Sequence, residues 1–380
     1  MSYQKTIGVD ARLYGRVSGG IGRYLKENLD YIIENDNFYY VFFLSPESYD
    51  DFCVVKKNVK KVLVNFRWYS LAEQLLFPFF IWREKIDLMF YPHFNVPILG
   101  MKKFVVVIHD LILLNYPSQR VSTLSPLIFK IKFFFYKLVI GFALSQSRRI
   151  ITVSDFTKND ILNNFNISSE KISVIYEGVS TLVLPEKNHE NNLHNDMFLR
   201  YNINNQYLLY VGNCYPHKNI EKLIAAFLVF RKNNPNISLI LVGKEDYFYK
   251  RLKQNIEKNK STGIILTGYV SDDELRELYK KALAYVFPSL YEGFGLPPLE
   301  AMSCGCPVIS SKSSCLPEIL ENAVLYFDAN SEANMVEAME KIAKNNDLRA
   351  DLIQKGYQQV IKYSWEKSAK KIEKILREEV

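Results

Sequence analysis

The sequence is poor in the residues that mark fibrous, low-complexity or disulfide-rich proteins. Glycine and proline together make up 30 of its 380 residues, and its five cysteines are scattered at positions 53, 214, 304, 306 and 315. An odd, dispersed set of cysteines forms no disulfide framework and indicates a reducing compartment. Cys304, Cys306 and Cys315 lack the spacing of common zinc sites and have no histidine nearby, so we expect no metal there.

Long apolar runs are also missing. The longest, residues 133–144, is 12 residues long and contains Lys137. A helix that spans a bilayer needs about 18–20 apolar residues. The first residues, MSYQKTIGVDAR, lack the apolar core of a signal peptide. We therefore expect a cytoplasmic protein, with a peripheral position at the inner face of the cytoplasmic membrane left open.

Acidic residues are absent between Asp110 and Asp155, where six basic residues and many aromatics occur. The net charge of +7 is too small for a dedicated nucleic-acid binder, and residues 1–180 carry +6 of it. A basic, aromatic segment is typical of a helix in a lipid headgroup layer, but equally of a buried helix in a large domain. The apolar stretch 75–82, followed by Arg83 and Lys85, has the same character. Both interpretations stay open.

Hydrophobic residues make up 48% of the chain, enough for a sizeable core, and its length favours two domains. Short apolar runs alternate with helical patterns, which indicates parallel α/β architecture. A polar segment at 187–196 predicts an exposed linker between two doubly wound domains that face a cleft. The predicted strands are residues 6–9, 39–43, 61–64, 88–91, 104–108, 149–153, 172–175, 207–211, 238–242, 264–267, 284–287, 308–310 and 323–327. The predicted helices include residues 22–35, 220–233, 272–281, 298–304, 332–345 and 365–377.

Loops at the carboxyl ends of strands bind ligands in such folds, and two of them lie in the first half. Residues 15–22 follow the first strand and open a helix, so the backbone of Gly19 and Gly20 could meet a phosphate. Their spacing fits neither a dinucleotide fingerprint nor a P-loop, and a tight structural turn is the alternative. His109 follows another strand and could polarise a hydroxyl, unless it is a structural histidine. His93 is a weaker candidate of the same kind.

Two loops in the second half carry more chemistry. Residues 210–219 place Lys218 just before a helix, where a cation and a helix N-terminus form an anion site. In residues 287–302, Glu292 and Glu300 flank a Gly-Phe-Gly turn, so both carboxylates can line one pocket. We expect Pro298 near the first position of the helix and Glu300 in its first turn. A structural turn and cap would not need Glu292.

These segments together resemble the retaining glycosyltransferases of family 4, which have the GT-B fold. The segment EGFGLPPLEAMSCGCPVI resembles the family's E-x7-E signature, and six other motifs follow the family's order. They are SGGIGRY at 18–24, IHDL at 108–111, TVSDFTKNDI at 152–161, KISVIYEGV at 171–179, YVGNCYPHKN at 210–219 and TGYVSDDEL at 267–275. The IGVDAR and VGN-xx-PHKN motifs look most like mannosyltransferase-like members in bacterial surface polysaccharide assembly, such as that of the O-antigen of lipopolysaccharide.

The resemblance implies two Rossmann-like domains. It predicts an N-terminal acceptor domain at 1–185, joined by the C-terminal helix at 364–380, and a C-terminal donor domain at 200–363. It implies that Glu292 holds the donor sugar and acts in catalysis with His109, while Glu300 holds the ribose. The implied donor contacts are Gly19, Gly20, Asn213, Lys218, Val270, Phe294, Gly295, Leu296 and Glu300. Many members carry an arginine where this chain has Asn213, so diphosphate binding would depend more on Lys218.

The expected function is transfer of a hexose, mannose from GDP-mannose, to a glycan acceptor that is lipid-linked. No Asp-x-Asp metal motif lies at a suitable strand end, so no metal and no cofactor is expected. Lys218, helix N-termini and glycine N–H groups could stabilise the diphosphate leaving group instead. A UDP-sugar transferase is the alternative, followed by a nucleotide-sugar epimerase or a non-catalytic sugar-nucleotide-binding module. The expected partners are the donor and the acceptor, without nucleic acid, and peripheral contact with an anionic membrane is left open.

Overall fold

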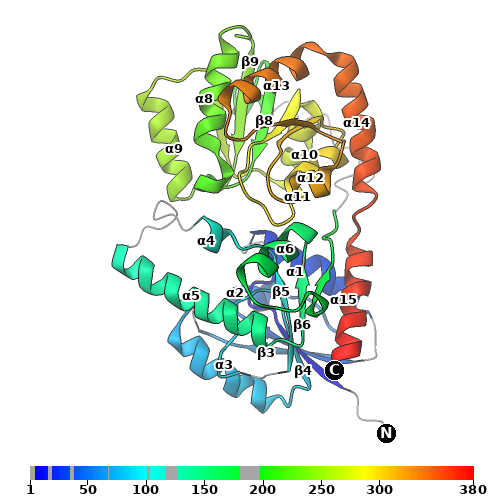
Figure 1. The fold of residues 1–380 in the computed structure, drawn as a ribbon. Helices are drawn as coiled ribbons and strands as arrows, with labels where there is room; N and C mark the ends of the chain where they lie inside the picture. The colour runs from blue at the N-terminus through cyan, green and yellow to red at the C-terminus, as the bar shows by residue number, and fades with distance from the viewer. Residues whose placement is uncertain are drawn as a thin grey trace. The chain divides into compact units, whose positions relative to one another are not determined.

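The chain forms two units in a computed structural model that describes residues 5–15, 19–34, 38–66, 68–100, 103–116, 126–179 and 197–380 (Figure 1). The first unit takes in the described residues of Met1–Asn115, Ser122–Gly178 and Ser364–Val380. The second takes in those of Tyr116–Val121 and Val179–Tyr363. The polar linker predicted at 187–196 lies outside the described residues.

The first unit is built on a parallel sheet of seven strands in the order β3-β2-β1-β4-β5-β6-β7. Its central strands are buried on both faces, as expected of short apolar runs in a parallel sheet. The strands are β1 (Thr6–Asp10), β2 (Tyr39–Leu44), β3 (Val59–Leu63), β4 (Leu88–Tyr91), β5 (Phe104–Ile108), β6 (Arg149–Thr152) and β7 (Ile172–Val174).

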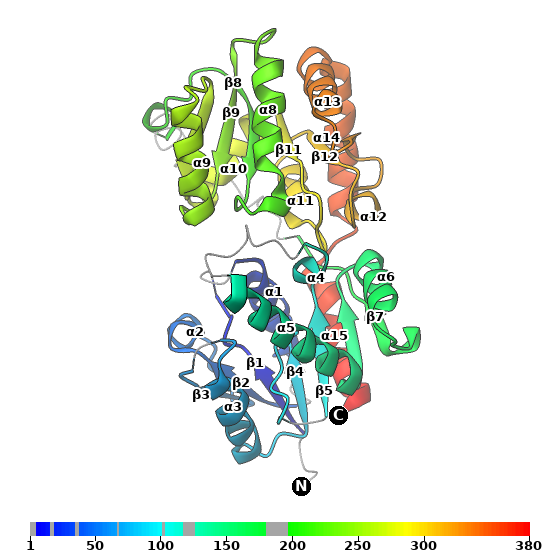
Figure 2. The same cartoon turned by 60° about the vertical axis from the view of Figure 1, so that its left-hand side comes forward.

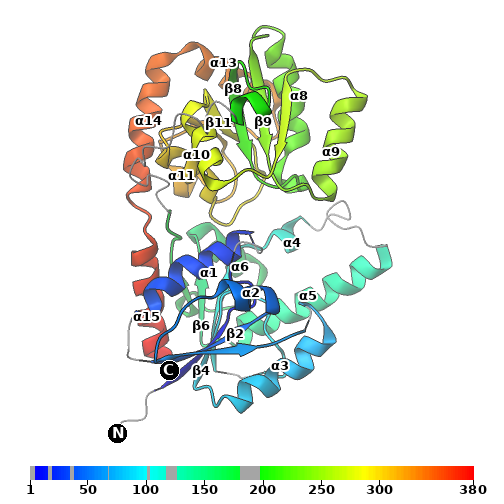
Figure 3. The same ribbon diagram turned by 180° about the vertical axis from the view of Figure 1, so that it is seen from behind.

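Helices cover both faces of this sheet. One core cluster joins Phe77 and Ile81 of α3, Leu144 of α5 and Ile161 of α6, so these three helices share a face. On the other face, α1 packs against α15, and the two lie side by side when the molecule is seen from behind (Figure 3). The helices are α1 (Gly19–Ile32), α2 (Pro46–Asp51), α3 (Leu71–Arg83), α4 (Ile112–Asn115), α5 (Pro126–Gln146), α6 (Asp155–Asn164) and α15 (Trp365–Glu379).

The second unit has a parallel sheet of six strands in the order β10-β9-β8-β11-β12-β13, covered by helices (Figure 2). The strands are β8 (Gln206–Val211), β9 (Ile237–Val242), β10 (Ile264–Gly268), β11 (Ala284–Phe287), β12 (Val308–Ser311) and β13 (Leu325–Phe327). The helices are α8 (Ile220–Arg231), α9 (Tyr247–Lys258), α10 (Asp272–Lys281), α11 (Leu296–Ser303), α12 (Leu316–Leu320), α13 (Glu332–Lys344) and α14 (Asn346–Val360).

The C-terminal helix α15 belongs to the first unit although it follows the second in the chain. Its Trp365 is buried and packs edge-on against Tyr24 of α1, with ring centroids 6.1 Å apart. Gly178, at the end of the first unit's N-terminal part, lies directly against the backbone of Trp365. The predicted fold class, two doubly wound parallel α/β domains with a C-terminal helix that returns to the N-terminal one, is confirmed.

Several predicted boundaries are wrong by one to three residues. Helix α1 begins at Gly19, not at residue 22, because a poor helix former is tolerated in a first turn. Strand β13 begins at Leu325 rather than at 323, because its pairing with β12 starts there. Helix α11 begins at Leu296, so Pro298 is the third helical residue and Glu300 lies beyond the first turn. Both expectations for that helix start were therefore wrong.

Candidate active site

Both sheets reverse their strand order at one point, between β1 and β4 in the first and between β8 and β11 in the second. In open α/β sheets, ligands bind beyond the carboxyl ends of the strands at such a switch point. The loops that follow these four strands are therefore the candidate sites. All four lead to or contain residues that the sequence predicted.

The loop after β8 is held in an unusual backbone conformation. Gly212 has φ 150°, and a Cβ there would lie 2.7 Å from the Tyr210 hydroxyl. That hydroxyl donates a 2.7 Å hydrogen bond to the Asn213 carbonyl. A short 3-10 turn over Pro216–Lys218 follows, and Asn219, in the left-handed region at φ 61°, precedes α8. The turn thus places Lys218 at the start of a helix, as predicted.

The loop after β11 is tied to this turn by hydrogen bonds. The Leu290 amide donates to the His217 carbonyl at 2.8 Å. The Asn219 side chain donates to the Pro288 carbonyl at 3.2 Å. The Glu292 amide donates to the Ser314 hydroxyl at 2.9 Å. The first two contacts fix the two loops of the switch point against each other, and the third ties the loop after β11 to the loop after β12.

Lys218 and Glu292 meet as a result. The Lys218 ammonium donates a 2.6 Å hydrogen bond to the Glu292 carboxylate, and their side chains are only 15% and 10% exposed. The same ammonium lies 5.7 Å from the centre of the Phe287 ring. The pair places one positive and one negative group, both largely removed from water, at the switch point. A diphosphate could attract the ammonium, and a sugar hydroxyl could donate to the carboxylate.

Glu300 lies on α11 and is also buried. Its charge and that of Glu292 both act on Tyr285 of β11. Burial first, and then the negative charges of Glu300 and Glu292, raise the pKa of Tyr285 well above its usual value.

The start of α11 differs from an ordinary anion-binding helix terminus. Gly295, at φ 89°, is the N-cap, and a Cβ there would lie 2.9 Å from the Leu316 side chain. A helix leaves its first four N–H groups without intrahelical acceptors, but Pro297 and Pro298 have no N–H to offer. The neighbouring Phe294 is buried, with its ring edge-on to Tyr363 at 5.4 Å. Fewer amides are thus available here than the glycine-rich sequence suggested.

Val270, the candidate base contact, lies between β10 and α10. It is buried, whereas the adjacent Tyr269 is 70% exposed. Ser271 then caps α10 in a reciprocal pair with Glu274, which fixes the direction in which the chain leaves this loop.

His109 follows β5 in the first unit and has partners on both ring nitrogens. Nδ1 lies 3.2 Å from the Glu177 carboxylate, and Nε2 lies 2.9 Å from the Pro92 carbonyl. Burial opposes the charged ring, but the hydrogen bond and charge of Glu177, with the Pro92 carbonyl, raise the pKa of His109. Glu177 was not singled out in the sequence. Its place three residues after β7, at a strand's carboxyl end, is the signal that could have found it.

Gly19 and Gly20 begin α1 with an open backbone. Gly19 has φ 61°, and among the described residues no side chain or distant backbone atom lies within 4 Å of a Cβ built on either glycine. Packing within the protein therefore does not explain why residue 20 is glycine. Close approach of a ligand to this backbone would explain it. Residues 16–18 of the same loop lie outside the described residues.

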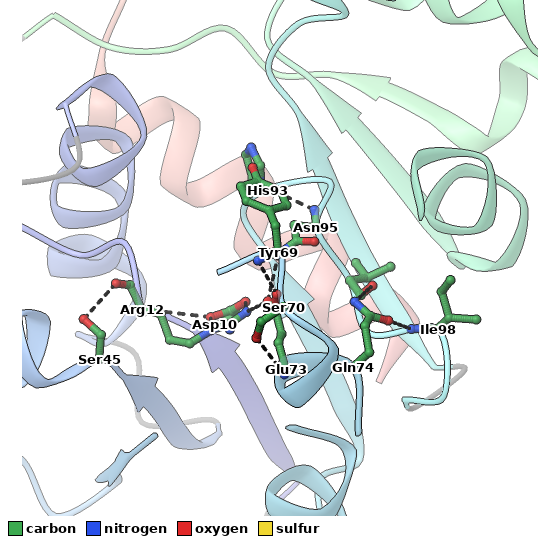
Figure 4. Close-up of polar contacts among 11 residues, drawn as sticks. Asp10, Arg12, Ser45, Tyr69, Ser70, Glu73, Gln74, His93, Asn95 and Ile98 are labelled. Atoms are coloured by element: carbon green, nitrogen blue, oxygen red, sulfur yellow. Dashed lines mark hydrogen bonds and ion pairs between the residues drawn. The ribbon is translucent and has the colours of Figure 1, made fainter. Parts of the chain in front are cut away.

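The loops after β1 and β4 meet in a buried charge network (Figure 4). Arg12 donates to Asp10 at 2.8 and 2.7 Å, and its Nη2 lies 2.7 Å from the Glu73 carboxylate. The Asn95 side chain donates to Glu73 at 2.8 Å. The Arg12 guanidinium also lies 4.1 Å from the centre of the Trp68 ring. The sequence did not predict this network. The charged residues Asp10 and Arg12, directly after the predicted strand 6–9, could have indicated it.

His93, the weaker histidine candidate, lies beside this network (Figure 4). Its Nδ1 accepts a hydrogen bond from the Asn95 amide at 3.4 Å. Removal from water, reinforced by the positive charges of His109 and Arg12, lowers the pKa of His93 to about 3. A ring with that pKa is neutral near pH 7.

The three cysteines of the second unit that lie close in sequence are all buried. Burial raises the pKa of Cys304 and Cys306, and that of Cys315 rises well above its usual value. Thiols of this kind are poor ligands and nucleophiles. No group of three or more His, Cys, Asp or Glu that could hold a metal occurs within the described residues.

Comparison with known families decides what this site belongs to. Residues 18–181 match the model of Glycosyltransferase Family 4, and residues 198–359 match that of Glycosyl transferases group 1. The two models together cover most of both units. The chain carries a family 4 glycosyltransferase domain, followed by a group 1 glycosyl transferase domain. The resemblance of the sequence motifs to this family is thereby confirmed, and the protein is a glycosyltransferase.

Named relatives of this glycosyltransferase include mannosyltransferases. It is 28% identical over 281 residues to the O-antigen chain mannosyltransferase RfbU of Salmonella typhimurium, covering 74% of this chain and 71% of RfbU. It is 34% identical over 227 residues to the O-antigen chain mannosyltransferase B of Escherichia coli, covering 59% of each. The matched part thus spans less than two thirds of mannosyltransferase B.

Solved structures share the fold of this glycosyltransferase. Anabaena Alr3699/HepE, crystallised with UDP and glucose, superimposes with a TM-score of 0.76 at 16% identity, over 99% of this chain and 100% of HepE. At that identity the likeness concerns the fold alone.

Proposed function

We propose that this glycosyltransferase transfers mannose from GDP-mannose to a lipid-linked glycan acceptor, with retention at the anomeric carbon, in surface polysaccharide assembly. The observation that carries the site is the contact between Lys218 and Glu292 at the switch point of the second sheet. The choice of mannose is supported by the O-antigen chain mannosyltransferases that the chain resembles.

Lys218 and Glu292 neutralise each other in this structure. In the proposed function the donor diphosphate replaces Glu292 as the partner of the Lys218 ammonium. Glu292 then accepts a hydrogen bond from a hydroxyl of the donor sugar. The Lys218 ammonium then stays paired with a negative group and the Glu292 carboxylate stays hydrogen-bonded, which limits the several kcal/mol that an unpaired buried charge costs. The absence of a basic side chain at Asn213 makes Lys218 the main cation for the diphosphate.

The remaining predicted residues complete the proposed site. Glu300 holds the ribose hydroxyls, and the backbone of Phe294, Gly295 and Leu296 meets sugar and phosphate. Val270 lines the base. From the first unit, His109 acts in catalysis and the Gly19–Gly20 backbone contacts the donor. A protonated His109, favoured by Glu177, would add positive charge for the leaving group.

The leaving group is a nucleoside diphosphate, on which negative charge develops as the sugar departs. A preorganised donor aimed at such charge stabilises a transition state by on the order of 3–4 kcal/mol. In the proposed reaction, Lys218 and His109 supply this stabilisation in place of a metal ion.

The donor is tested first by thermal shift with GDP-mannose, UDP-glucose and ADP-glucose. A ligand at 100 times its dissociation constant stabilises a protein by about 2.7 kcal/mol, which is enough to rank the three. We expect GDP-mannose to stabilise most. A larger shift with UDP-glucose would contradict the proposed donor and favour a UDP-sugar transferase.

Turnover is tested next with radiolabelled GDP-mannose and extracted lipid-linked acceptor. We expect Glu292→Gln to remove most transfer, and Glu300→Gln mainly to weaken donor binding. Near-normal transfer by Glu292→Gln would show that its role is wrongly assigned. Conversion of GDP-mannose to another nucleotide sugar without acceptor would indicate an epimerase, and binding without any turnover would indicate a binding module.

A further inference from the structure

The outward face of helix α3 is apolar. The helix buries Glu73, Phe77 and Ile81, which are four residues apart, against the first sheet. A surface helix normally carries polar residues on the opposite side. Here that side carries large hydrophobic residues that are 49–78% exposed: Leu71, Leu75, Leu76, Phe79 and Trp82.

Helix α5 continues this pattern. Its C-terminal part is buried at Ile140, Ala143 and Leu144, so the interpretation of this segment as a core helix holds there. Its earlier part is not buried. Six large hydrophobic residues are 45–69% exposed: Leu127, Ile128, Ile131, Phe134, Phe135 and Leu138.

These eleven residues lie on one face of one unit, which we call the α3–α5 face. Helices α3 and α5 pack on the same side of the first sheet through one core cluster. Figures 1 and 2 show both helices on the side of the sheet away from α1. Leu99, 67% exposed, lines a depression beside Pro78 and Trp82 of α3 and extends the same face.

The charge around the α3–α5 face has one sign. Its exposed basic residues are Arg83, Lys85, Lys130, Lys132 and Lys137. Within the described parts of the chain, none of these five pairs with a carboxylate, and the Lys137 ammonium lies 4.7 Å from the Phe133 ring centre. The carboxylate of Glu73 is buried on Arg12, and that of Glu84 is bound by Lys60. The face is therefore apolar and cationic.

We propose that the α3–α5 face docks on the surface of an anionic lipid bilayer. Exposed aromatic and aliphatic side chains enter the headgroup boundary, and the surrounding lysines and arginines bind lipid phosphates. A second copy of the chain fits less well, because a symmetric contact would bring two sets of the same cations together. No helix among the described residues has the length and apolarity to cross a bilayer, so the contact is peripheral.

The position of this face suits a lipid-linked acceptor. Helix α3 begins at the carboxyl edge of the first sheet, since Glu73 in its first turn touches Arg12 and Asn95 of the strand-end loops. The exposed part of α5 is its N-terminal part, which follows the same edge. Docking therefore deepens the proposed transfer to a lipid-linked acceptor, but the binding it predicts needs neither donor nor turnover.

Vesicle co-sedimentation of the full chain without donor tests the electrostatic part. We expect binding to vesicles of phosphatidylcholine with phosphatidylglycerol, little binding to phosphatidylcholine alone, and a fall with added salt. Each lysine near an anionic surface contributes about fivefold in affinity, so changing Lys130, Lys132 and Lys137 to Glu should weaken binding at least about 100-fold. The matched control changes Lys250, Lys253 and Lys258 of α9 to Glu and should alter binding far less. Equal loss in both variants would overturn the proposal.

A second variant tests the apolar part. Changing Leu75, Phe79 and Trp82 to Ser should remove the binding that persists at high salt. Its control changes Val229, Tyr247 and Ile361 to Ser, which are similarly exposed in the second unit. Unchanged binding by the variant at Leu75, Phe79 and Trp82 would overturn the proposal. A second outcome would also overturn it. In that outcome the original chain forms a dimer in solution and does not bind vesicles, and the Leu75, Phe79 and Trp82 variant, but not its control, is a monomer. GDP-mannose binding is measured with the variant at Lys130, Lys132 and Lys137. This measurement separates a failure of the docking proposal from a failure of the proposed donor.

Discussion

At the scale of single residues, the site depends on charges that are buried and paired across long sequence distances. Lys218 meets Glu292, and His109 meets Glu177, within 3.2 Å in each case. The Lys218–Glu292 pair is neutral overall until a ligand changes one partner. The predictions that follow each remove one partner.

Replacing Lys218 by Ala should weaken nucleoside diphosphate binding by about 10- to 100-fold, because a hydrogen bond to a charged group contributes about 1.5–3 kcal/mol. Guanosine, which has no phosphate, should bind almost as before. Isothermal titration with GDP and with guanosine measures both. Lys232→Ala, at the exposed end of α8, is the control and should change neither. Equal weakening of GDP and guanosine would contradict the role of Lys218.

The pairing of His109 with Glu177 should make stability depend on pH. The folded-state pKa of His109 is raised above the unfolded value of about 6.5, so the protonated ring stabilises the fold below that pH. This contribution is lost as the pH rises through the raised pKa. Urea unfolding between pH 5.5 and 9 should show the loss.

Glu177→Gln should reduce the pH dependence of unfolding in that range. Burial then acts against only the Pro92 carbonyl and the charge of Asp110, so the pKa of His109 should fall, as an NMR titration of the ring would detect. Glu170→Gln, in the neighbouring exposed turn, provides the comparison. A raised His109 pKa that survives in Glu177→Gln would show that another group causes it.

At the scale of elements, the buried network beneath the first unit's loops holds a helix start. Arg12, Asp10 and Glu73 have side chains that are 0–3% exposed, and the Tyr69 amide donates to Glu73 at 2.7 Å. Tyr69 itself has φ 57°, an uncommon conformation for a residue with a side chain. The network thus fixes the turn that precedes α3 to the ends of β1 and β4.

Glu73→Gln should destabilise the first unit by about 1.5–3 kcal/mol, because it removes one of the two buried carboxylates that bind the Arg12 guanidinium. All three tryptophans, at positions 68, 82 and 365, belong to the first unit, so their fluorescence in urea follows its unfolding alone. Lys5→Ala breaks the exposed pair with Asp87 and should cost at most about 1 kcal/mol. Similar stabilities for Glu73→Gln and Lys5→Ala would contradict a structural role for the network.

At the scale of the whole molecule, the chain leaves the first unit and comes back to it. The exit at Gly178 and the return at Trp365 touch, and a Cβ on Gly178 would lie 2.1 Å from the Trp365 amide nitrogen. No side chain larger than hydrogen fits between the two segments. The return of α15 therefore depends on one glycine.

Gly178→Ala should destabilise the first unit by about 1–3 kcal/mol or more, since the added methyl group forces two backbones apart. The tryptophan fluorescence transition should shift to lower urea, while hydrogen exchange in β8 and β9 should stay unchanged. Gly141→Ala is the matched control, because no side chain in the described part of the chain lies within 4 Å of its Cβ and alanine favours a helix. A Gly178→Ala variant as stable as Gly141→Ala would show that the exit and the return adjust freely.

The sequence alone determined the order of strands and helices, the two-domain α/β class and the family. Short apolar runs bounded by turns specify buried parallel strands, and the Glu292–Glu300 segment and its companions specify the family. These features are local, so their signal lies in neighbouring residues. The two glycines that begin α1 and the start of α11 were misjudged because helix ends depend on capping and packing as well as on propensity.

Only the tertiary structure decided which distant residues meet and which faces stay exposed. Glu177 lies 68 residues from His109, and Glu73 lies 61 from Arg12, so no local pattern could pair them. The sequence pattern of α3 and α5 could not show whether these helices are buried or have an exposed apolar face. A helix of either kind carries apolar residues on all its sides. That difference is settled by what packs against each side, and packing is a property of the whole fold.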